Sequence, residues 1–469
     1  MRYDTQIDEW VHGHRQELLD DLKTLCRIRS VTGTPQENAP YGPGPAAALD
    51  AAEAMCAGFG FAVQDHDRRV MTADYGSPDG RKLDILAHLD VVDEGTGWTS
   101  NPYEPLLRDD GYLYGRGVAD DKGGVICALY ALRCVKELGI ELKHGCRLIF
   151  GTDEECGSSD VEYYYRHNAP APNTFTPDAE FPLCNAEKGF YRLRFKKSWQ
   201  PAAGEGIHVR RLDGGISVNA VPGQASAELS GISPLHLMAG ASPLCAELGA
   251  SCTIDELEDG AKITVTARGC HAASPELGLN ANTVLIRVLT ELPLADDDAA
   301  NALRAIDKLL PHGDYLGRAL GIATQDAPTG ELTCSFTNIH LTETGLEGLC
   351  DCRVPLCATA ENCADVSQAA MRRAGFEAAG IIVPPHYTPE DTDFIKTLLA
   401  CYEDCTGQPG QCYHMGGGTY VHDVPGGVAF GIGMPGVDVR MHSPDERFPL
   451  EDLYTSVRIF ARAIAEICG

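Results

Sequence analysis

A histidine and an aspartate two residues apart, His88 and Asp90, end the short apolar run Leu83–Asp90. An apolar run of this length between turn residues is typical of a buried strand, and residues two apart on a strand point to the same side. A metal-binding imidazole usually donates its second ring N–H to a carboxylate, which holds the ring in one orientation. His88 is therefore a candidate metal ligand and Asp90 the candidate carboxylate that orients it. The pair by itself is also compatible with an ordinary strand end.

Further carboxylates and a second histidine could complete such a site. Imidazole and carboxylate ligands together suit zinc, manganese or cobalt, and two such ions about 3.5–4 Å apart need a shared carboxylate. We expect Asp120 to be the shared one, because it lies in the glycine-rich stretch Gly115–Gly124, where the backbone can approach closely. The full set of candidate ligands is His88, Asp120, Glu155, Asp178 and His442.

Two adjacent glutamates, Glu154 and Glu155, follow an apolar strand predicted over 147–151. Adjacent side chains of an extended segment diverge, so both cannot be ordinary ligands of one ion. One can bind the metal while the other takes a proton from a metal-held water, whose pKa falls toward ~7. That division of roles is typical of a metallohydrolase. The structural alternative is an acidic turn ahead of a helix predicted over 160–167, where carboxylates favour the helix dipole.

Composition and motifs argue against other function classes. The formal net charge of −29 would repel nucleic acids and anionic membranes, and no apolar run approaches the ~20 residues of a membrane span. The 19 cysteines include no Cys-x-x-Cys pair, and the sequence contains neither a Gly-x-Ser-x-Gly elbow nor a P-loop. The stretch Gly431–Gly436 matches G-x-G-x-x-G, but it includes a proline and leads into no helix. We expect a cytoplasmic protein with free thiols.

Alternating helices and strands position the candidate residues. Such alternation predicts an α/β sheet with parallel strands, whose chemistry lies beyond the carboxyl ends of the strands. The predicted helices span 7–28, 45–59, 125–138 and 160–167, and the strands 61–63, 70–75, 83–90 and 147–151. The pattern changes near Asn185, and strands mixed with helices follow from Gly189 to about Pro385. It then returns to helix, strand and helix at 394–403, 427–432 and 450–467.

The chain is therefore expected to have an α+β insertion of about 200 residues. Within it, strands are predicted over 190–195, 207–211, 262–267, 332–339 and 348–354, and helices over 235–248 and 279–292. The predicted division is a catalytic domain in two parts, 1–187 and 386–469, with an inserted lid or substrate domain over 188–385.

Five motifs in order along the chain resemble the co-catalytic zinc peptidase family, which includes the aminoacylases, carboxypeptidase G and acetylornithine deacetylase. They are Ala87–Asp90, Gly115–Gly123, Gly151–Glu155, Pro177–Pro182 and Met441–Glu446. Within the family the chain is most similar to the dipeptidase V, or Xaa-His dipeptidase, branch, on the segments Asp178–Gly189 and Gly416–Tyr420 and on its long insertion. The resemblance implies a mainly parallel α/β sheet flanked by helices, with a large inserted α+β lid domain.

The resemblance also implies roles for single residues. Asp120 would bridge two metal ions, most often zinc with manganese or cobalt as alternatives, and would precede a cis peptide to Asp121. Glu154 would be the general base and then the acid, and Asp90 would orient His88. The remaining metal ligands would be His88, Glu155, Asp178 and His442. From the insertion, His271 would stabilise the oxyanion, and the substrate would be held by Asn219, Arg353 and the amides of Gly417 and Gly418.

The implied activity is hydrolysis of unblocked dipeptides by a hydroxide that bridges the two ions. Deacylation of N-acyl amino acids at the same centre is an alternative, and a non-catalytic metal-binding scaffold is a third reading. A long insertion can supply His271 from the same chain, so a monomer is compatible with the resemblance and a homodimer stays open. One departure concerns Val421 and His422, which stand where the branch usually has a small residue and then arginine.

Overall fold

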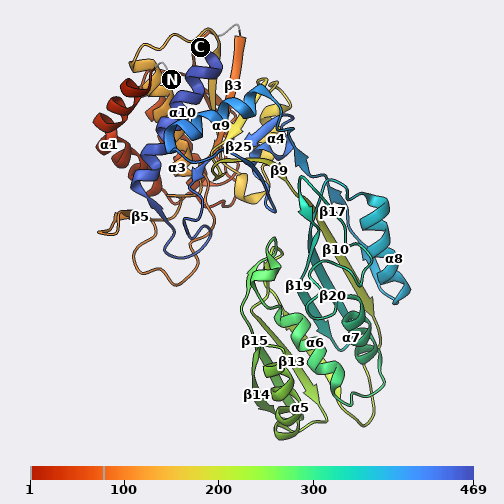
Figure 1. Cartoon of the computed structure of the whole chain (residues 1–469). Helices are drawn as coiled ribbons and strands as arrows, with labels where there is room; N and C mark the ends of the chain where they lie inside the picture. Colours follow the sequence, from red (N-terminus) through yellow and green to blue (C-terminus); the bar gives the residue numbers. More distant parts are fainter. Residues whose placement is uncertain (1–2, 78–79) are drawn as a thin grey trace. The chain divides into compact units, whose positions relative to one another are not determined.

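The structure, a computed structural model, describes residues 3–77 and 80–469 and divides the chain into two compact units (Figure 1). Unit 1 comprises Met1–Ala186, Tyr387–Tyr413 and Gly418–Gly469, and unit 2 comprises Glu187–His386 and His414–Gly417. The fold is α/β with a large inserted α+β domain, which confirms the fold class predicted from the sequence. None of the helices in the described residues is long and apolar enough to cross a membrane.

Unit 1 is built on a mixed sheet whose central strands are parallel. Strand β3 (Arg81–His88) lies between β6 (Gly145–Gly151) and β7 (Asn173–Thr176) and is parallel to both. Strand β25 (Gly427–Ala429) continues the sheet parallel to β7. The sheet order is β1-β2-β6-β3-β7-β25-β9-β23, with β24 paired to β9. The other strands are β1 (Ala62–His66), β2 (Val70–Tyr75), β9 (Leu183–Glu187), β23 (His386–Tyr387) and β24 (Cys412–Met415).

Helices cover this sheet and form the core of unit 1 with it. Helix α3 (Lys122–Glu137) is buried on nearly all sides, which is expected of a helix that is apolar around its circumference. It packs against α1 (Asp4–Cys26) and α10 (Leu450–Cys468). The other helices are α2 (Pro43–Gly58), α4 (Ser159–Tyr165) and α9 (Asp393–Thr406), with short turns of helix η2 (Glu154–Cys156) and η5 (Tyr420–Asp423). Two small sheets are also part of the unit. One has three strands in the order β27 (Arg447–Pro449), β5 (Tyr112–Tyr114) and β4 (Leu106–Leu107), and the other pairs β8 (Ala179–Glu180) with β26 (Ile432–Gly433).

A buried acid in the middle of β3 makes the stability of unit 1 depend on pH. Asp84 is fully buried, and burial raises its pKa to about 6 although Arg81 Nε lies 2.9 Å from its carboxylate. Because the folded pKa lies above the unfolded value, this group's contribution to stability is complete below about pH 4 and is lost as the pH rises through the folded pKa. We expect the free energy of unfolding of Asp84→Asn to rise by about 1 kcal/mol relative to that of the wild type as the pH increases from about 5 to about 8. Urea unfolding of both proteins at each pH measures this difference. Parallel curves for the two proteins would contradict this expectation.

Unit 2 is an antiparallel sheet with helices on one face. The strand order is β14-β15-β13-β11-β19-β20-β10-β21, with β22 paired to β10. The strands are β10 (Gly189–Ser198), β11 (His208–Gly214), β13 (Gln224–Ser230), β14 (Ser251–Leu257), β15 (Gly260–Thr266), β19 (Thr333–Thr342), β20 (Gly345–Val354), β21 (Glu377–Ala379) and β22 (Ile382–Val383). The helices are α5 (Pro234–Glu247), α6 (Ala281–Glu291), α7 (Asp298–Leu309) and α8 (Asp365–Arg373). Shorter elements are β12 (Ala220–Val221), β16 (Cys270–His271), β17 (Gln325–Asp326), β18 (Gly330–Glu331), η3 (Pro275–Leu277) and η4 (Ala360–Ala364).

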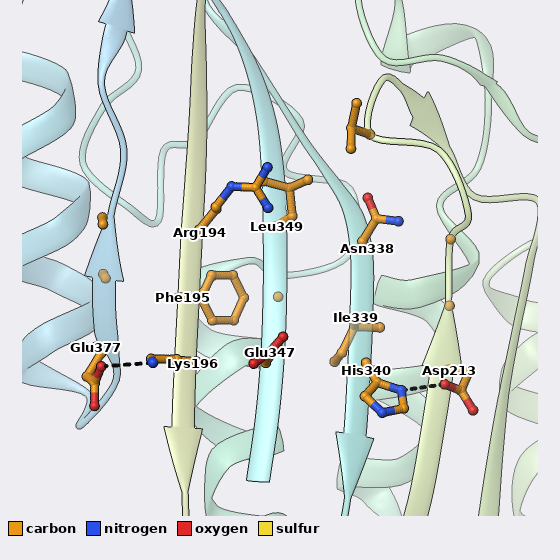
Figure 2. A pocket seen from close by; sticks show the side chains of 16 residues that line it. Arg194, Phe195, Lys196, Asp213, Asn338, Ile339, His340, Glu347, Leu349 and Glu377 are labelled. Atoms are coloured by element: carbon orange, nitrogen blue, oxygen red, sulfur yellow. Dashed lines mark hydrogen bonds and ion pairs between the residues drawn. The ribbon is translucent and has the colours of Figure 1, made fainter. Parts of the chain in front are cut away.

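A hollow on this sheet is lined by both charged and apolar side chains (Figure 2). On β10, Leu193 is buried while Arg194 and Lys196 are exposed, as the two-residue period of a strand requires. The hollow has a volume of about 760 Å³ and is lined by β10, β11, β19, β20 and β21. Cross-strand pairs line it, with His340 Nδ1 2.6 Å from Asp213 Oδ1 and Lys196 Nζ 3.5 Å from Glu377 Oε2.

Candidate metal centre

The five candidate ligands lie together in unit 1. His88 ends β3, Glu155 follows β6 and Asp178 follows β7, so three of them come from the carboxyl ends of neighbouring parallel strands. Asp120 lies just before α3, and His442 lies in the turn before β27. The five side chains therefore come together at the carboxyl end of the parallel strands, although they lie up to 354 positions apart in the sequence (442 − 88).

Asp120 faces both imidazoles of the cluster. Its Oδ1 lies 3.0 Å from His88 Nε2, and its Oδ2 lies 2.7 Å from His442 Nε2. His88 Nε2 is also 3.8 Å from Asp178 Oδ2, and His442 Nε2 is 3.3 Å from Glu155 Oε2. One carboxylate thus joins two half-sites, each completed by one histidine and one further acid. This is the arrangement expected of a carboxylate shared by two cations.

The donor set fits divalent cations. Two groups of ligand atoms lie within 4.8 Å of one another, His88 with Asp120 and Glu155, and His88 with Glu154 and Asp178. Glu155 Oε1 is buried and has no hydrogen-bond partner among the described residues. A buried carboxylate oxygen without a partner is costly, and a bound cation would satisfy it.

The pKa values of the clustered side chains also indicate a cation-binding site. Burial raises the pKa of Glu154 and of Asp178 well above the ordinary carboxyl value, and neighbouring carboxylates raise both further. Burial opposes the protonation of His88, but hydrogen bonds to Asp120 and Asp90 raise its pKa well above the usual value. His442 behaves alike, since Asp120 and Glu155 outweigh burial and raise its pKa to about 11. These pKa shifts share one cause, the crowding of carboxylates, and a cation bound among them would relieve the repulsion that otherwise makes these groups hold protons.

Asp90 lies one residue beyond the end of the cluster's central strand and contacts more than His88. The strand predicted over 83–90 ends at His88, so Asp90 is outside it. His88 Nδ1 lies 3.0 Å from the backbone carbonyl of Asp90 and 3.5 Å from its Oδ1. The carboxylate of Asp90 accepts hydrogen bonds from the backbone amides of Glu154, at 3.2 Å, and Glu155, at 3.1 Å. Asp90 thus holds both the imidazole and the two-glutamate turn.

A buried ion pair that the sequence reasoning missed supports the Asp120 loop. Glu446 Oε1 accepts hydrogen bonds from the amides of Ala119, at 2.9 Å, and Asp120, at 3.3 Å. Its other oxygen accepts from Arg116 at 2.6 Å. The peptide from Asp120 to Asp121 is cis, as predicted, and Asp121 Oδ2 accepts from the amide of His88 at 3.2 Å. Glu446 and Arg116 both lie inside motifs that the sequence had singled out.

A second missed group lies behind the Glu154–Glu155 turn. Asp160 is fully buried and accepts hydrogen bonds from the amides of Thr152, at 2.5 Å, and Asp153, at 3.0 Å, and from Tyr420 Oη at 2.6 Å. The ring of Tyr420 meets His88 edge to face, with 6.1 Å between centroids. A Cβ at Gly151 would lie 2.1 Å from Tyr420 Oη, so only glycine fits there. Asp160 therefore fixes the backbone just before the Glu154–Glu155 turn.

The predicted substrate residues of the insertion lie in unit 2. His271 and Asn219 are neighbours there, because β12 and β16 pair Ala220 with His271 and the amide of Ala272 donates to the Asn219 carbonyl at 2.8 Å. The amide of Ala273 donates to His271 Nδ1 at 3.2 Å. His271 is exposed within its unit.

Arg353 is buried and already hydrogen-bonded. Its Nε and Nη2 each lie 2.9 Å from Oδ2 of the fully buried Asp351, and its Nη1 donates to the carbonyl of Gly416 at 2.6 Å. Its guanidinium also stacks over Phe190, 4.6 Å from the ring centroid. In this arrangement Arg353 holds the glycine loop, so a substrate carboxylate would have to share or displace these partners.

The glycine loop spans both units. Gly417 belongs to unit 2 and Gly418 to unit 1. A Cβ at Gly416 would lie 2.9 Å from the Cβ of Ala273, which brings the loop next to the His271 segment inside unit 2. His422 lies in η5, and its amide donates to the carbonyl of Thr419 at 2.9 Å.

Comparison with known proteins confirms the resemblance predicted from the motifs. The family model described as Peptidase family M20/M25/M40 matches residues 85–466. The chain is 30% identical over 471 residues to the beta-Ala-Xaa dipeptidase of Lactobacillus delbrueckii subsp. lactis, covering 99% of this chain and 98% of that protein. Human carnosine dipeptidase 1 has a similar fold, with a TM-score of 0.59 and 15% identity over 99% of each chain. The aminoacylhistidine dipeptidase of Vibrio alginolyticus gives a TM-score of 0.58 and 15% identity over 96% of each chain.

Proposed function

The chain belongs to peptidase family M20/M25/M40, and from that membership we propose that it is a metal-dependent dipeptidase that hydrolyses unblocked dipeptides. The observation that carries the proposal is Asp120, whose two carboxylate oxygens face the imidazoles of His88 and His442. The similarity to the beta-Ala-Xaa dipeptidase over 99% of the chain supports a dipeptide as substrate.

Five residues would hold two divalent cations, zinc first and manganese or cobalt as alternatives: His88, Asp178, Glu155 and His442, with Asp120 shared. When bound, such cations would lower the pKa of a water molecule and polarise the substrate carbonyl. Asp90 and Glu446 would keep the ligands in place, Asp90 through His88 and the Glu154–Glu155 amides and Glu446 through the amides of Ala119 and Asp120.

Glu154 would act as the proton carrier. It lies in the same group of ligand atoms as His88 and Asp178, but it is not needed by either half-site around Asp120. Burial raises its pKa, so that its carboxyl can keep a proton taken from the attacking water until the leaving amine accepts it.

The insertion would supply the groups that recognise the substrate. We propose that residues 188–385 form the lid domain of a catalytic domain made of 1–187 and 386–469, and the two compact units support this division. His271 would stabilise the oxyanion, and Asn219, Arg353, Gly417 and Gly418 would hold the dipeptide's polar ends. The contacts of His271 with the Asn219 strand and of Arg353 with Gly416 support a shared role for these residues.

Metal removal tests the proposal directly. We expect a strong chelator, followed by dialysis, to reduce hydrolysis of alanyl and β-alanyl dipeptides by more than about 100-fold, and zinc, manganese or cobalt to restore it. The assay is release of free amino acids from a dipeptide library, with N-acetyl amino acids offered in parallel.

The outcomes separate the alternatives. Hydrolysis of N-acetyl amino acids in preference to dipeptides would replace the proposed activity by deacylation at the same centre. No hydrolysis of either class by protein shown to contain metal would favour a scaffold role. Full activity in the continued presence of chelator would overturn the metal dependence itself.

A further inference from the structure

Three buried thiols lie close together in the core of unit 2, whereas the candidate metal ligands belong to unit 1. Cys334 on β19 is paired directly across the ladder with Cys352 on β20, and Cys350 precedes Cys352 by two residues on the same side of that strand. All three are free cysteines that are at most 4% exposed. Directly opposed residues of an antiparallel pair have Cα atoms about 4.5–5.5 Å apart, a separation that a disulfide can bridge.

The contacts among the three thiols single out Cys334. Cys350 and Cys352 both hydrogen-bond to the sulfur of Cys334, which lowers the pKa of Cys334 below the ordinary thiol value. Burial raises the pKa of Cys350, and the hydrogen bond to Cys334 raises that of Cys352. The thiolate is the reactive form of cysteine, and Cys334 is also the one of these three residues that lines a cavity, so we take it as the nucleophile of the cluster.

Cys334 also borders a small cavity of unit 2. It lines a cavity of about 130 Å³ together with His312, Asp314 and Tyr315. A cavity holds one water when it offers about 10–15 Å³ to a water-sized probe, so this one has room for hydrogen peroxide. Tyr315 on its wall is 39% exposed, which places one side of the cavity at the surface of the unit.

We propose that Cys334 and Cys352 form an oxidisable dithiol site that closes to a disulfide on reaction with hydrogen peroxide. The thiolate of Cys334 attacks one peroxide oxygen and the O–O bond breaks, leaving a sulfenic acid and a hydroxide that takes up a proton to become water. Cys352 then loses its proton and attacks that sulfur, the S–O bond breaks, and the hydroxide leaves with the proton as a second water. Two thiols are oxidised and one peroxide is reduced to two waters.

The dithiol lies beside both segments of unit 2 that we expect to meet the substrate. Cys352 is next to Arg353, and Cys334 is next to Ser335, whose hydroxyl donates to the carbonyl of Ala272 at 3.0 Å, one residue after His271. A covalent link between β19 and β20 at this point would restrain both neighbours. Formation of the disulfide does not depend on the proposed dipeptidase activity, so mapping the bond tests this inference separately.

The test is peroxide treatment of the native full chain, followed by alkylation of remaining thiols and peptide mapping by mass spectrometry. We expect loss of two free thiols, a Cys334–Cys352 cross-link, and recovery of both thiols with dithiothreitol. Cys352→Ser should leave a sulfenic acid at Cys334 that dimedone traps. Cys350→Ser should keep the cross-link, because the opposed pair is intact.

Another pair of contacting thiols is the matched control. Cys146 and Cys468 also hydrogen-bond to each other, both are almost wholly buried, and burial raises the pKa of Cys146. We expect this pair to stay reduced under conditions that oxidise Cys334. The inference is overturned if Cys334 and Cys352 remain reduced while the exposed Cys156 is oxidised, or if the bridge joins Cys334 to Cys350.

Discussion

Replacing Glu154 by glutamine should lower kcat for dipeptide hydrolysis by about 10²–10⁴-fold while the metal content stays unchanged. Glutamine has nearly the same shape but cannot take a proton from water or return one to the leaving amine. The half-sites around Asp120 use His88, Asp178, Glu155 and His442, so they do not need the Glu154 carboxylate. Steady-state kinetics together with elemental analysis of the purified variant measure both parts of the expectation.

The neighbouring acid supplies the control for this experiment. Asp153 uses its carboxylate to accept a hydrogen bond from the Ser159 hydroxyl at 2.6 Å, and asparagine keeps an oxygen acceptor for it. Asp153→Asn should therefore keep kcat within a few-fold of the wild type. If Glu154→Gln retained turnover within about tenfold, or lost its metal, the assignment of Glu154 as proton carrier would be wrong.

Asp120→Asn should have the second large effect, the loss of metal binding. The substitution removes the charge that both half-sites share and turns one of the two facing oxygens into an N–H donor. Because loss of a supporting group alone typically costs 10–100-fold in metal affinity, we expect loss of this ligand to cost more than about 100-fold. Zinc titration after dialysis should show fewer than two tightly bound ions per chain, and dipeptide hydrolysis should fall to background.

Asp110→Asn is the matched control for that variant. Asp110 precedes Asp120 by ten residues and accepts hydrogen bonds from the amide of Tyr112, at 3.1 Å, and from Tyr114 Oη, at 2.8 Å. It contacts none of the five candidate ligands in the described interactions, and asparagine keeps its acceptor oxygen. Two tightly bound ions in Asp120→Asn would show that Asp120 is not the shared ligand.

Much of the fold follows from local sequence patterns. Helix α3 was predictable from a long apolar stretch that ends at a glycine, and strands β2 and β6 from short segments rich in apolar residues. Helices α7 and α8 were missed, although Asp297 caps α7 by accepting from the amide of Ala300 at 2.8 Å. Both helices nevertheless have an amphipathic pattern, with Leu303 and Ile306 buried on α7 and Ala370 and Met371 on α8, so a usable signal was overlooked. The strand predicted over 427–432 is two short strands, β25 and β26, separated by Phe430 and Gly431.

The ligands of the candidate site could be predicted from the sequence for a different reason. Its ligands stand at strand ends and inside ordered motifs, where residue type and position together carry information. The supporting residues could not be predicted in this way. Asp160 is one of 67 acidic residues, and no neighbouring residue in the sequence indicates that it accepts a hydrogen bond from Tyr420, 260 positions away. The same holds for Arg353, whose guanidinium holds a carbonyl 63 positions later. Such contacts exist only once the sheets have assembled.

The four-residue segment His414–Gly417 limits how this protein could be recombined with its relatives. It groups with unit 2, although the sequence on either side of it belongs to unit 1. Its Gly416 carbonyl is held by Arg353, and its Met415 carbonyl accepts from the amide of Lys188 at 3.0 Å. A chimaera that exchanges only residues 187–386 would therefore leave this segment facing a foreign surface. The insertion and this segment form one structural unit made of two separate stretches of sequence, so a functional chimaera has to exchange both together.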